Sequence, residues 1–496
     1  MTERVVVIGA GMAGLWTALA LAPTGRRLVL LDRDPAPPEG GVQAAFDDWR
    51  RRGVGQLRHS HAFLARLRLL IRDTYPDLLA DLLAAGCREL PFENALTALH
   101  RRRYAPKPVD RDLVILTSRR TTLEWVMRRH VERLPGVTIR AGVFACGLEI
   151  EPGEPMRVVG VRLADGELVA GDLVVDAGGR AAPALSAAEA LGAPIAREAA
   201  PAGIVYFTRH YRLLEGATEP ARGRGSTTAD LGYLKFGVFP ADGGWFSVTL
   251  CLPEVETEMR KSIVAPDTFD AVCRQLPGVA PWVAADRARG VSRVFGMGGL
   301  DSAWADLAPR GRPAVLGLFG VGDSAARTNP LYGRGCAFAA VAAHVLRDAL
   351  EATRDPGARL LRYRAGMRRE LRPYYDVMTA ADRAADRRAR QLLTHSARPS
   401  LRRRLLRSFL RDGVQIAVRS DPDLLRAFLR GFHMLEHPQA WLRRPGNLAK
   451  VLRVWARGRR RNAEAYPVAG PERAALLSAV GVSPGRDVER LTSARA

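Results

Sequence analysis

The residues of this sequence that could do chemistry are carboxylates and histidines placed beside glycine-rich turns. Asp323 follows an apolar segment at 314–319, and its carboxylate can accept hydrogen bonds from a polyol. The turn that comes next, Asn329-Pro-Leu-Tyr-Gly-Arg-Gly335, precedes an alanine-rich helix. Such a turn presents backbone N–H groups and a helix N-terminus to a polar ligand.

A second glycine-rich turn lies near the start of the chain, where Gly9-Ala-Gly11-Met-Ala-Gly14 has G-x-G-x-x-G spacing. In this motif the first glycine permits a tight turn, the second lets the backbone approach a pyrophosphate, and the third lets helix and strand pack closely. Asp32 is placed to hydrogen-bond an adenosine ribose. These residues predict a dinucleotide site, but the motif does not distinguish NAD from FAD.

The segments around this turn are those of a strand–turn–helix unit. Residues 4–8, with the apolar run Val-Val-Val-Ile after Arg4, and the apolar residues 28–31 read as buried parallel strands. Residues 15–22 are typical of a helix that Pro23 and Gly25 stop. The predicted order is strand, glycine turn, helix, strand and acid, which is the context that the dinucleotide motif requires.

The middle of the chain favours further strands. Residues 171–180 form another apolar segment that closes in glycines. Segments 204–214, 231–239 and 245–252 read as strands, the last two joined by a hairpin, so we expect an antiparallel sheet there. From residue 337 onward the pattern is mostly helical.

The composition suits a large cytoplasmic protein. With 496 residues and 47% hydrophobic content the chain can bury an extensive core. No apolar run reaches the roughly 18 residues that span a membrane, and a core strand begins almost directly after Met1, so we expect no signal peptide. The five cysteines are scattered, which indicates reduced thiols, and we expect no metal site.

Arginine dominates the charge, with a formal net value of +23. Only four of the 75 basic residues are lysine, which suggests that part of the arginine excess reflects coding bias. Residues 361–461 hold 26 basic and 8 acidic side chains, so the basic character belongs mainly to the C-terminal region.

Along the chain, the motifs come in the order Gly9 to Asp32, the segment 171–180, and the late segment from Asp323 to Gly335. This order resembles that of the FAD-dependent monooxygenases of the aromatic-hydroxylase type, whose relatives include polyketide epoxidases, geranylgeranyl reductases and flavin halogenases. The resemblance covers about residues 1–350. It implies an α/β fold: a Rossmann-like FAD-binding domain at 1–200, with a helical insertion at 43–115, and again at 296–350. An antiparallel-sheet substrate domain at 201–295 and a basic helical region at 351–496 complete the prediction.

The resemblance also implies which residues bind FAD. The first motif and Asp32 correspond to the ADP end, Arg120 to the pyrophosphate side, Asp323 to the ribityl chain, and the late turn to the flavin ring. The full set of expected cofactor-binding residues is Gly9, Gly11, Ala13, Gly14, Asp32, Arg33, Arg58, Arg120, Asp176, Gly178, Gly322, Asp323, Pro330, Gly333, Gly335 and Cys336.

Candidate catalytic residues are Arg58, His59, His61 and Tyr332. Similar sequences place an arginine–histidine stretch before a helix that approaches the flavin, where histidines could gate protons. The alternative is that these histidines only cap a helix or bond the backbone. Candidate residues of the substrate pocket are Tyr206, Phe236, Phe239, Trp245 and Phe246, and ordinary core packing is the alternative for each.

Departures from the relatives narrow the expected activity. The tryptophan–proline signature and early lysine of flavin halogenases are absent, which disfavours halogenation. Simple aromatic hydroxylases usually have a His-x-x-x-Pro pattern after the late Gly-Asp, and here Arg327-Thr-Asn-Pro330 replaces it. The pattern Asn-Pro-x-Tyr-Gly-x-Gly makes the late turn closer to the epoxidase branch. We expect epoxidation or hydroxylation, through a flavin C4a-hydroperoxide, of an apolar substrate that is alkene-bearing or polycyclic. A flavin-dependent reductase or dehydrogenase of an isoprenoid or other unsaturated lipid is the alternative, and a halogenase the second. NAD(P)H or a partner reductase would supply the electrons.

The basic C-terminal region contains two amphipathic patterns, at 401–410 and 448–455. They suit a lid that packs on the flavin domain with its arginines solvated. They also suit docking on an anionic membrane through 361–461, which would make the protein peripheral on the inner face of the membrane. Nucleic-acid binding ranks last, because no recognition motif accompanies the arginines.

Overall fold

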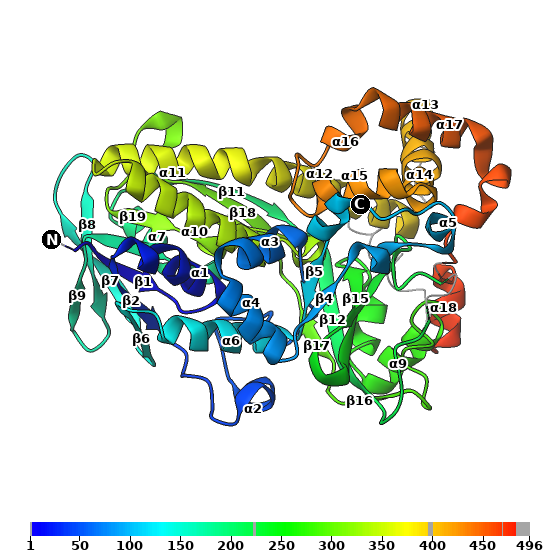
Figure 1. Cartoon of the computed structure of the whole chain (residues 1–496), viewed down its shortest axis with the longest axis horizontal. Helices are drawn as coiled ribbons and strands as arrows, with labels where there is room; N and C mark the ends of the chain where they lie inside the picture. Colours follow the sequence, from blue (N-terminus) through cyan, green and yellow to red (C-terminus); the bar gives the residue numbers. More distant parts are fainter. Residues whose placement is uncertain (1, 222–224, 395–399, 469, 483–496) are drawn as a thin grey trace.

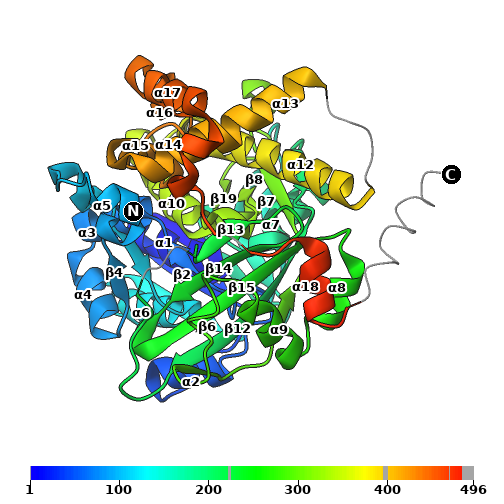
Figure 2. The same ribbon diagram turned by 90° about the vertical axis from the view of Figure 1, so that its right-hand side faces the viewer.

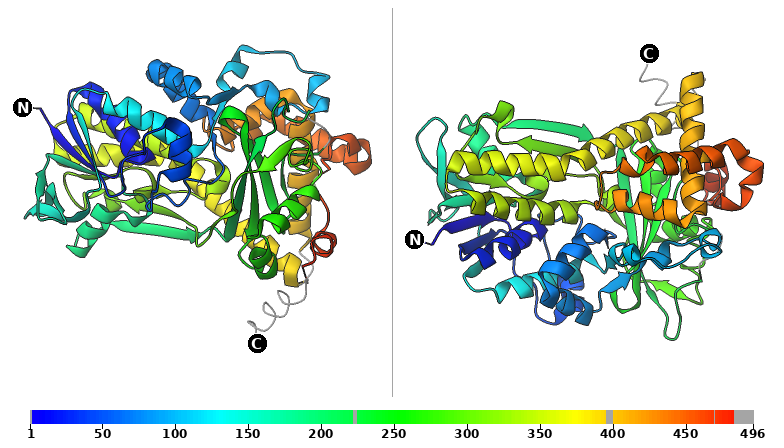
Figure 3. Two further views of the ribbon diagram at one scale, coloured as in Figure 1. Left: turned by 90° about the horizontal axis from the view of Figure 1, so that it is seen from below. Right: turned by 45° about the horizontal axis from the view of Figure 1, so that its top comes forward.

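The computed structural model describes residues 2–221, 225–394, 400–468 and 470–482. Figure 1 shows a parallel sheet with its helices around the N-terminus and, at the other end of the long axis, an antiparallel sheet beneath the C-terminal helices. The long helices α11 (Pro356–Glu370) and α12 (Arg372–Thr394) run from one part to the other (Figure 3). This arrangement confirms the predicted fold class.

Five apolar segments form the parallel sheet, in the order β19–β10–β1–β2–β6. Their bounds are β1 (Arg4–Ile8), β2 (Arg27–Asp32), β6 (Val137–Ala141), β10 (Leu173–Asp176) and β19 (Leu318–Gly320). The strand predicted at 314–319 begins later, at Leu318, because Gly317 turns the chain with φ +73°. The carboxyl ends of β1, β2, β10 and β19 meet at one edge, where a cofactor binds in open α/β sheets.

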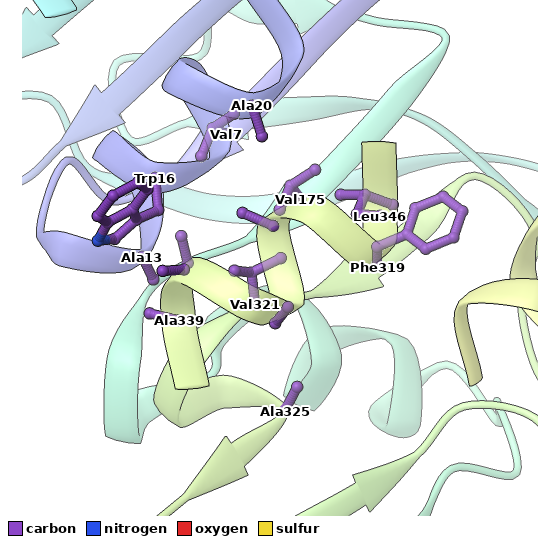
Figure 4. Packing of buried hydrophobic residues seen from close by; sticks show 14 of the residues in the cluster. Val7, Ala13, Trp16, Ala20, Val175, Phe319, Val321, Ala325, Ala339 and Leu346 are labelled. Atoms are coloured by element: carbon purple, nitrogen blue, oxygen red, sulfur yellow. The ribbon is translucent and has the colours of Figure 1, made fainter. Parts of the chain in front are cut away.

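Helices cover this sheet and bury its apolar side chains. Figure 4 shows Trp16 of α1 (Met12–Leu21) and Leu346 of α10 (Gly335–Ala352) near Val175 and Phe319 of the sheet. The remaining helices before α10 are α2 (Gly41–Asp48), α3 (Ala65–Thr74), α4 (Pro76–Ala84), α5 (Ala98–Arg101), α6 (Arg120–Glu132), α7 (Pro183–Ala190), α8 (Thr257–Ser262) and α9 (Pro266–Arg274).

The second large sheet is antiparallel, in the order β13–β14–β15–β12–β16, with β17 also paired to β12. Its strands are β12 (Ile204–Leu213), β13 (Thr228–Asp230), β14 (Lys235–Pro240), β15 (Trp245–Pro253), β16 (Ala288–Gly290) and β17 (Phe295–Met297). One face packs on α8, α9 and α18 (Arg473–Ala479) in a separate apolar core. The opposite face turns toward the N-terminal domain.

The described residues also form three small sheets. They are β3 (Ala62–Phe63), β5 (Ile115–Thr117) and β4 (Arg88–Leu90); β7 (Ala145–Glu151), β8 (Arg157–Leu163) and β9 (Leu168–Ala170); and β11 (Ala196–Pro201), β18 (Asp301–Asp306) and β20 (Ala326–Arg327). The last of these sheets is built from segments on either side of the large antiparallel sheet, so the chain leaves the N-terminal domain and returns to it at one place.

The C-terminal helices form a third core with the insertion that precedes β5. They are α13 (Leu401–Ser408), α14 (Gln415–Ser420), α15 (Pro422–Phe432), α16 (Ala440–Arg443) and α17 (Pro445–Arg461), with the π-helical turn η9 (Phe409–Val414) between α13 and α14. Ala417, Leu424 and Val451 pack against Phe92 and Leu113. Figure 2 shows α13 and α17 at the top of the molecule, above this core.

A buried ion pair fastens the antiparallel sheet to α6. Arg119, just before α6, donates to Asp242 from its backbone N–H at 2.7 Å and from its guanidinium at 2.7 and 2.9 Å. Thr122 adds a fourth hydrogen bond to the same carboxylate at 3.0 Å. Both side chains of the pair are 3% exposed. Asp242 lies in the turn between β14 and β15, so its carboxylate links the antiparallel sheet to the start of α6.

We expect Asp242→Ala to lower the free energy of unfolding by about 3–5 kcal/mol, because Arg119 would remain buried without its partner. Urea denaturation measures this change. Asp73→Ala removes an exposed partner of Arg72 and is the control, with an expected loss below about 1 kcal/mol. Equal losses in the two variants would contradict the role assigned to Asp242.

Candidate functional site

The turn after β1 contains two glycines that the backbone requires and one that leaves space. Gly9 has φ +102°, and a Cβ there would lie 2.6 Å from the Ala177 carbonyl oxygen. A Cβ on Gly14 would lie 1.9 Å from the Gly9 carbonyl oxygen. At Gly11 the nearest atom is 3.9 Å away and belongs to Glu124. The fold therefore needs Gly9 and Gly14, whereas Gly11 keeps the backbone open to a ligand.

A buried cluster of charged side chains faces this opening. Glu124, on α6, accepts hydrogen bonds from Arg120 at 2.9 Å and from Arg51. Arg51 also donates to Asp32 at 2.6 Å and to the Ala10 carbonyl oxygen at 3.3 Å. Burial raises the pKa of the Asp32 carboxyl, and Arg51 acts against that shift. Guanidinium groups and an acid thus lie beside Gly11, where phosphates and a ribose hydroxyl would be recognised.

Two members of this cluster, Arg51 and Glu124, were not predicted as site residues. Glu124 follows Arg120 by four residues on a helix, a spacing that places both side chains on one face, so the pattern could have identified it. Arg51 carries no local signal, because it comes from the loop after α2 and reaches the cluster only through tertiary contacts. Arg33, which was predicted, is exposed and contacts the loop at Gly53.

Asp323 lies at the same edge, in the turn after β19, and its carboxylate accepts no hydrogen bond from the described residues. Burial raises its pKa, against the attraction of Arg327 and Arg120. A Cβ on the preceding Gly322 would lie 2.7 Å from the Ala13 side chain, so this turn abuts α1. The Asp323 carboxylate, which lies beside the glycine turn 9–14 and has no hydrogen-bond partner among the described residues, could accept hydrogen bonds from the ribityl chain of FAD, as expected from the sequence.

The late turn is held by a hydrogen-bonded network that reaches the C-terminal region. Asn329 accepts from the Tyr206 hydroxyl at 2.5 Å and donates to Asp382 at 3.0 Å. The Tyr332 hydroxyl donates to Asp382 at 2.9 Å, and burial raises the pKa of that tyrosine. Tyr332 therefore positions the turn. Asp382, on α12, was missed because nothing in its surroundings in the sequence marks it.

Other predicted residues of this turn are placed around α10 and β3. Gly333 has φ +64° and lies against the Ala62 carbonyl oxygen. Pro330 begins a 3₁₀ turn, and Gly335 begins α10. The Cys336 thiol accepts a hydrogen bond from Arg120 at 3.4 Å, which connects the late turn to the charged cluster.

Asp176 and Gly178, predicted beside the cofactor, serve the fold in this structure. The Asp176 carboxylate accepts from the backbone N–H groups of Gly178, Ala184 and Leu185 at 2.8–2.9 Å, which caps the start of α7. Burial raises its pKa to about 6. A Cβ on Gly178 would lie 2.4 Å from the Pro183 ring, so this glycine permits the turn into the helix.

The two candidate histidines are neutral and hydrogen-bonded. His59 Nδ1 lies 2.9 Å from Thr208 Oγ1 on β12. His61 Nδ1 lies 2.9 Å from the His59 carbonyl oxygen and must donate to it, which leaves Nε2 to accept from Arg120 at 3.3 Å. Burial lowers the pKa of His59 to about 4 and that of His61 to about 3. His61 therefore orients Arg120 rather than delivering a proton at neutral pH.

A polar chain continues from His59 across the antiparallel sheet. Thr208 and Thr249 hydroxyls lie 2.7 Å apart, and Thr249 donates to Ser60 at 2.6 Å. Ser60 in turn lies 2.7 Å from Ser247. The loop of residues 51–61 is thus bonded to the face of the sheet that looks toward the glycine turns.

Arg58 was predicted to contact the cofactor or take part in catalysis, but its guanidinium donates to the carbonyl oxygens of Phe46 and Asp47 at 3.0 Å. It borders a cavity of about 310 Å³ between the loop 51–61 and the segment 293–296. Burial, with Arg293 next in importance, lowers the pKa of Arg58. The lining of this cavity between the two domains thus includes three arginines, Arg51, Arg58 and Arg293, beside apolar residues.

Of the five predicted pocket residues, three lie on the face of the sheet that looks toward the N-terminal domain. Tyr206 bonds Asn329, Trp245 packs on Phe46 at 5.0 Å, and Phe239 pairs with Ser247. Phe236 and Phe246 were also predicted to line the pocket, but both lie on the opposite face of the sheet, in the core shared with α8 and α9. Successive side chains of a strand alternate between faces, and this alternation sends Phe246 away from Trp245.

The arrangement fits FAD by the chemistry of its residues: an open glycine turn, the Asp32 carboxylate, guanidinium groups, and the Asp323 carboxylate, which accepts no hydrogen bond from the described residues, share one edge. In the described part of the chain, no group of three or more histidine, cysteine or acidic side chains could hold a metal ion. No helix there has the length and apolarity needed to cross a membrane.

The glycine geometry predicts opposite effects for two similar substitutions. Gly14→Ala should lower the melting temperature sharply, since overpacking costs about 1–3 kcal/mol or more. Gly11→Ala should leave the melting temperature of the flavin-free protein nearly unchanged and weaken FAD binding at least about tenfold, which isothermal titration calorimetry would measure. Unaltered FAD affinity in Gly11→Ala would show that the opening does not hold the cofactor.

The histidine environments predict a pH dependence of stability. Their pKa values are lower in the folded chain than the ordinary value of about 6.5, so the unfolded chain binds more protons between pH 6.5 and 4. Stability should fall as pH decreases through this window, by up to about 1.4 kcal/mol per pH unit for each histidine. His59→Gln and His61→Gln should each reduce this slope, whereas the exposed His437 mutated to Gln should not. Urea denaturation at a series of pH values measures the slope of the unfolding free energy against pH. The same slope in all variants and in the unmodified protein would contradict this prediction.

Comparison with known proteins agrees with this assignment. Residues 4–204 match the family model described as FAD binding domain. A search of curated proteins gave no significant match. Among solved structures, a triple mutant of the flavin-dependent brominase Bmp2 has a TM-score of 0.57 at 15% identity, covering 92% of this chain and 100% of that one.

Two further structures share the fold. The Diels-Alderase PyrE3 of the pyrroindomycin pathway has a TM-score of 0.55 at 17% identity, covering 88% of this chain and 81% of that one. The protein pqsL of Pseudomonas aeruginosa, described as a probable FAD-dependent monooxygenase, has a TM-score of 0.54 at 17% identity, covering 78% and 98%. The chain is therefore a flavoprotein that carries an FAD-binding domain in the fold of the FAD-dependent monooxygenases and their relatives.

Proposed function

We propose that this FAD-dependent oxidoreductase is a monooxygenase that inserts one oxygen atom into an apolar substrate, either alkene-bearing or polycyclic. The observation that supports this best is the direct bond between the cofactor edge and the sheet. Asn329, in the turn expected at the flavin ring, is hydrogen-bonded to Tyr206 on β12. One face of the antiparallel sheet would thus bound the space where the reacting end of FAD and a substrate meet.

The proposed reaction needs an electron source. FAD, when bound, takes two electrons from a reductant and passes them to O₂. One oxygen atom enters the substrate and the other leaves as water, so a turnover consumes one O₂, one two-electron reductant and one proton. The reductant is NAD(P)H, bound transiently, or a partner reductase.

The residues of the chain bind, orient and exclude water in this proposal. Asp323 would hold the polyol chain, and Arg120, fixed by His61 and Glu124, would face the phosphates. The hydroxyl chain from His59 to Ser247 keeps the loop 51–61 on the sheet, which shields the reacting centre from water. His59 and Tyr332 position these groups, since neither changes its charge near neutral pH.

A reductase or dehydrogenase of an isoprenoid or other unsaturated lipid, and a halogenase, are the competing activities. They differ from a monooxygenase in the fate of oxygen. A reductase works without O₂ and leaves no oxygen in the product, and a halogenase places a halide on the substrate.

The test is product analysis under ¹⁸O₂, with FAD-loaded protein, chemically reduced flavin and a panel of lipophilic alkenes and aromatics. We expect product that is heavier by one ¹⁸O atom, and no product without O₂. Turnover under anaerobic conditions would replace the proposal with the reductase. A halogenated product that appears only with added bromide or chloride would replace it with the halogenase.

A further inference from the structure

Helix α13 is exposed along its whole length, although it is rich in leucine. Every residue from Leu401 to Arg407 is exposed. Leu401 is 74% exposed, Leu405 59% and Leu406 57%. A helix of this length is not stable in water through its own hydrogen bonds, and it would ordinarily pack its leucines against a core. In this structure the leucines of α13 have no such core.

The exposed leucines continue beyond α13. Leu410, in η9, is 47% exposed, and Leu448 and Leu452, on α17, are 36% and 43% exposed. The Phe409 and Trp455 rings pack edge to face at 5.5 Å, and Trp455 donates to Ser408 at 3.0 Å. This contact holds α17 against η9, the turn that directly follows α13.

These leucines are interleaved with arginines, most of which have no side-chain partner in the described part of the chain. Neither α13 nor α17 contains an acidic residue. Seven arginines on them are exposed, and their guanidinium groups make no ion pair or hydrogen bond with a described residue: Arg402, Arg403, Arg404, Arg453, Arg457, Arg460 and Arg461. Elsewhere many arginines are paired, as Arg372 is with Glu198 and Arg364 with Asp306. We call the exposed residues of α13, Leu410 and α17 the leucine–arginine surface.

The chemistry of this surface selects its partner. Exposed leucines need an apolar phase, and unpaired guanidinium groups need anions beside it, which a bilayer with anionic headgroups supplies together. A nucleic acid would pair with the arginines but offers nothing to the leucines, and single strands need aromatic platforms. A second copy of this chain, with a net charge of +23, brings no complementary charge.

We propose that the leucine–arginine surface docks the protein on an anionic lipid bilayer, with the leucines of α13 inserted at the headgroup boundary and the arginines on lipid phosphates. The other face of the C-terminal helices remains packed on the insertion through Trp441 and Val451. This placement is independent of the reaction that FAD carries out.

Co-sedimentation of the FAD-loaded full-length protein with vesicles tests this proposal. We expect binding to equimolar phosphatidylglycerol–phosphatidylcholine vesicles, little binding to phosphatidylcholine alone, and weakening by added salt. Arg402→Gln/Arg403→Gln/Arg404→Gln should weaken binding on the order of 100-fold, at about tenfold or less per charge near the surface. Leu401→Gln/Leu405→Gln/Leu406→Gln should weaken it at least about tenfold.

Matched controls use exposed residues elsewhere on the molecule. Leu83→Gln/Leu168→Gln/Leu191→Gln changes leucines that are 42–48% exposed, and Arg103→Gln/Arg212→Gln/Arg274→Gln changes exposed arginines outside the C-terminal helices. Both triples should bind vesicles like the unmodified protein. Unchanged melting temperature and flavin content show that each variant is folded.

Three outcomes would overturn the proposal. They are absence of binding to anionic vesicles, equal binding by the leucine triple and its control, and equal binding to both vesicle types. Tight binding to RNA or DNA that is lost in the arginine triple but kept in the leucine triple would assign the surface to nucleic acid instead. Dimerisation in analytical ultracentrifugation that only the leucine triple abolishes would assign it to a second copy of the chain.

Discussion

The carboxylate of Glu124 is the point on which the cofactor site depends. It is fully buried and accepts hydrogen bonds from two guanidinium groups, one from its own helix and one from the loop after α2. Removing that carboxylate would leave Arg51 and Arg120 buried with less charge compensation, at a cost of several kcal/mol. Through Arg51 the cluster also fixes Asp32 and the carbonyl oxygen of Ala10. One acid therefore organises the glycine turn, Asp32 and the two guanidinium groups of the candidate site.

The candidate site also depends on the attachment of the antiparallel sheet to the carboxyl edge of the parallel sheet. Three of the contacts that make it are Asp242 with Arg119, the hydroxyl chain between Thr208 and Ser60, and Asn329 with Tyr206. All three use paired polar groups that are buried or partly buried, so each would leave an unsatisfied partner if broken. The sheet is consequently a fixed wall of the site. Its alternation decides that Trp245 faces the cofactor edge while Phe246 enters the opposite core.

The C-terminal region divides its arginines and leucines between two roles. Arg334 is buried among the rings of Tyr332, Tyr374 and Phe432, and Arg426 is paired with Asp110. Leu424 and Val451 enter a core with the insertion. Among the described residues, Arg402, Arg403 and Arg404 of α13 have no acidic or aromatic partner, and the leucines of this helix enter no core. The abundance of arginine and leucine in this region thus produces buried ion pairs and core packing at some positions and an exposed surface at others.

The sequence by itself determined the fold class, the cofactor and most of the parallel strands, because these depend on local patterns. Strand–glycine–helix spacing needs no knowledge of the rest of the chain, and Gly9, Gly14 and Asp32 lie where that spacing put them. Tertiary structure alone decided the roles of Arg51, Asp382 and Asp242, since each acts on residues far away in the chain. It also decided that the buried histidines are neutral, because a pKa depends on burial, and that α13 lies open, because exposure depends on what packs against a helix.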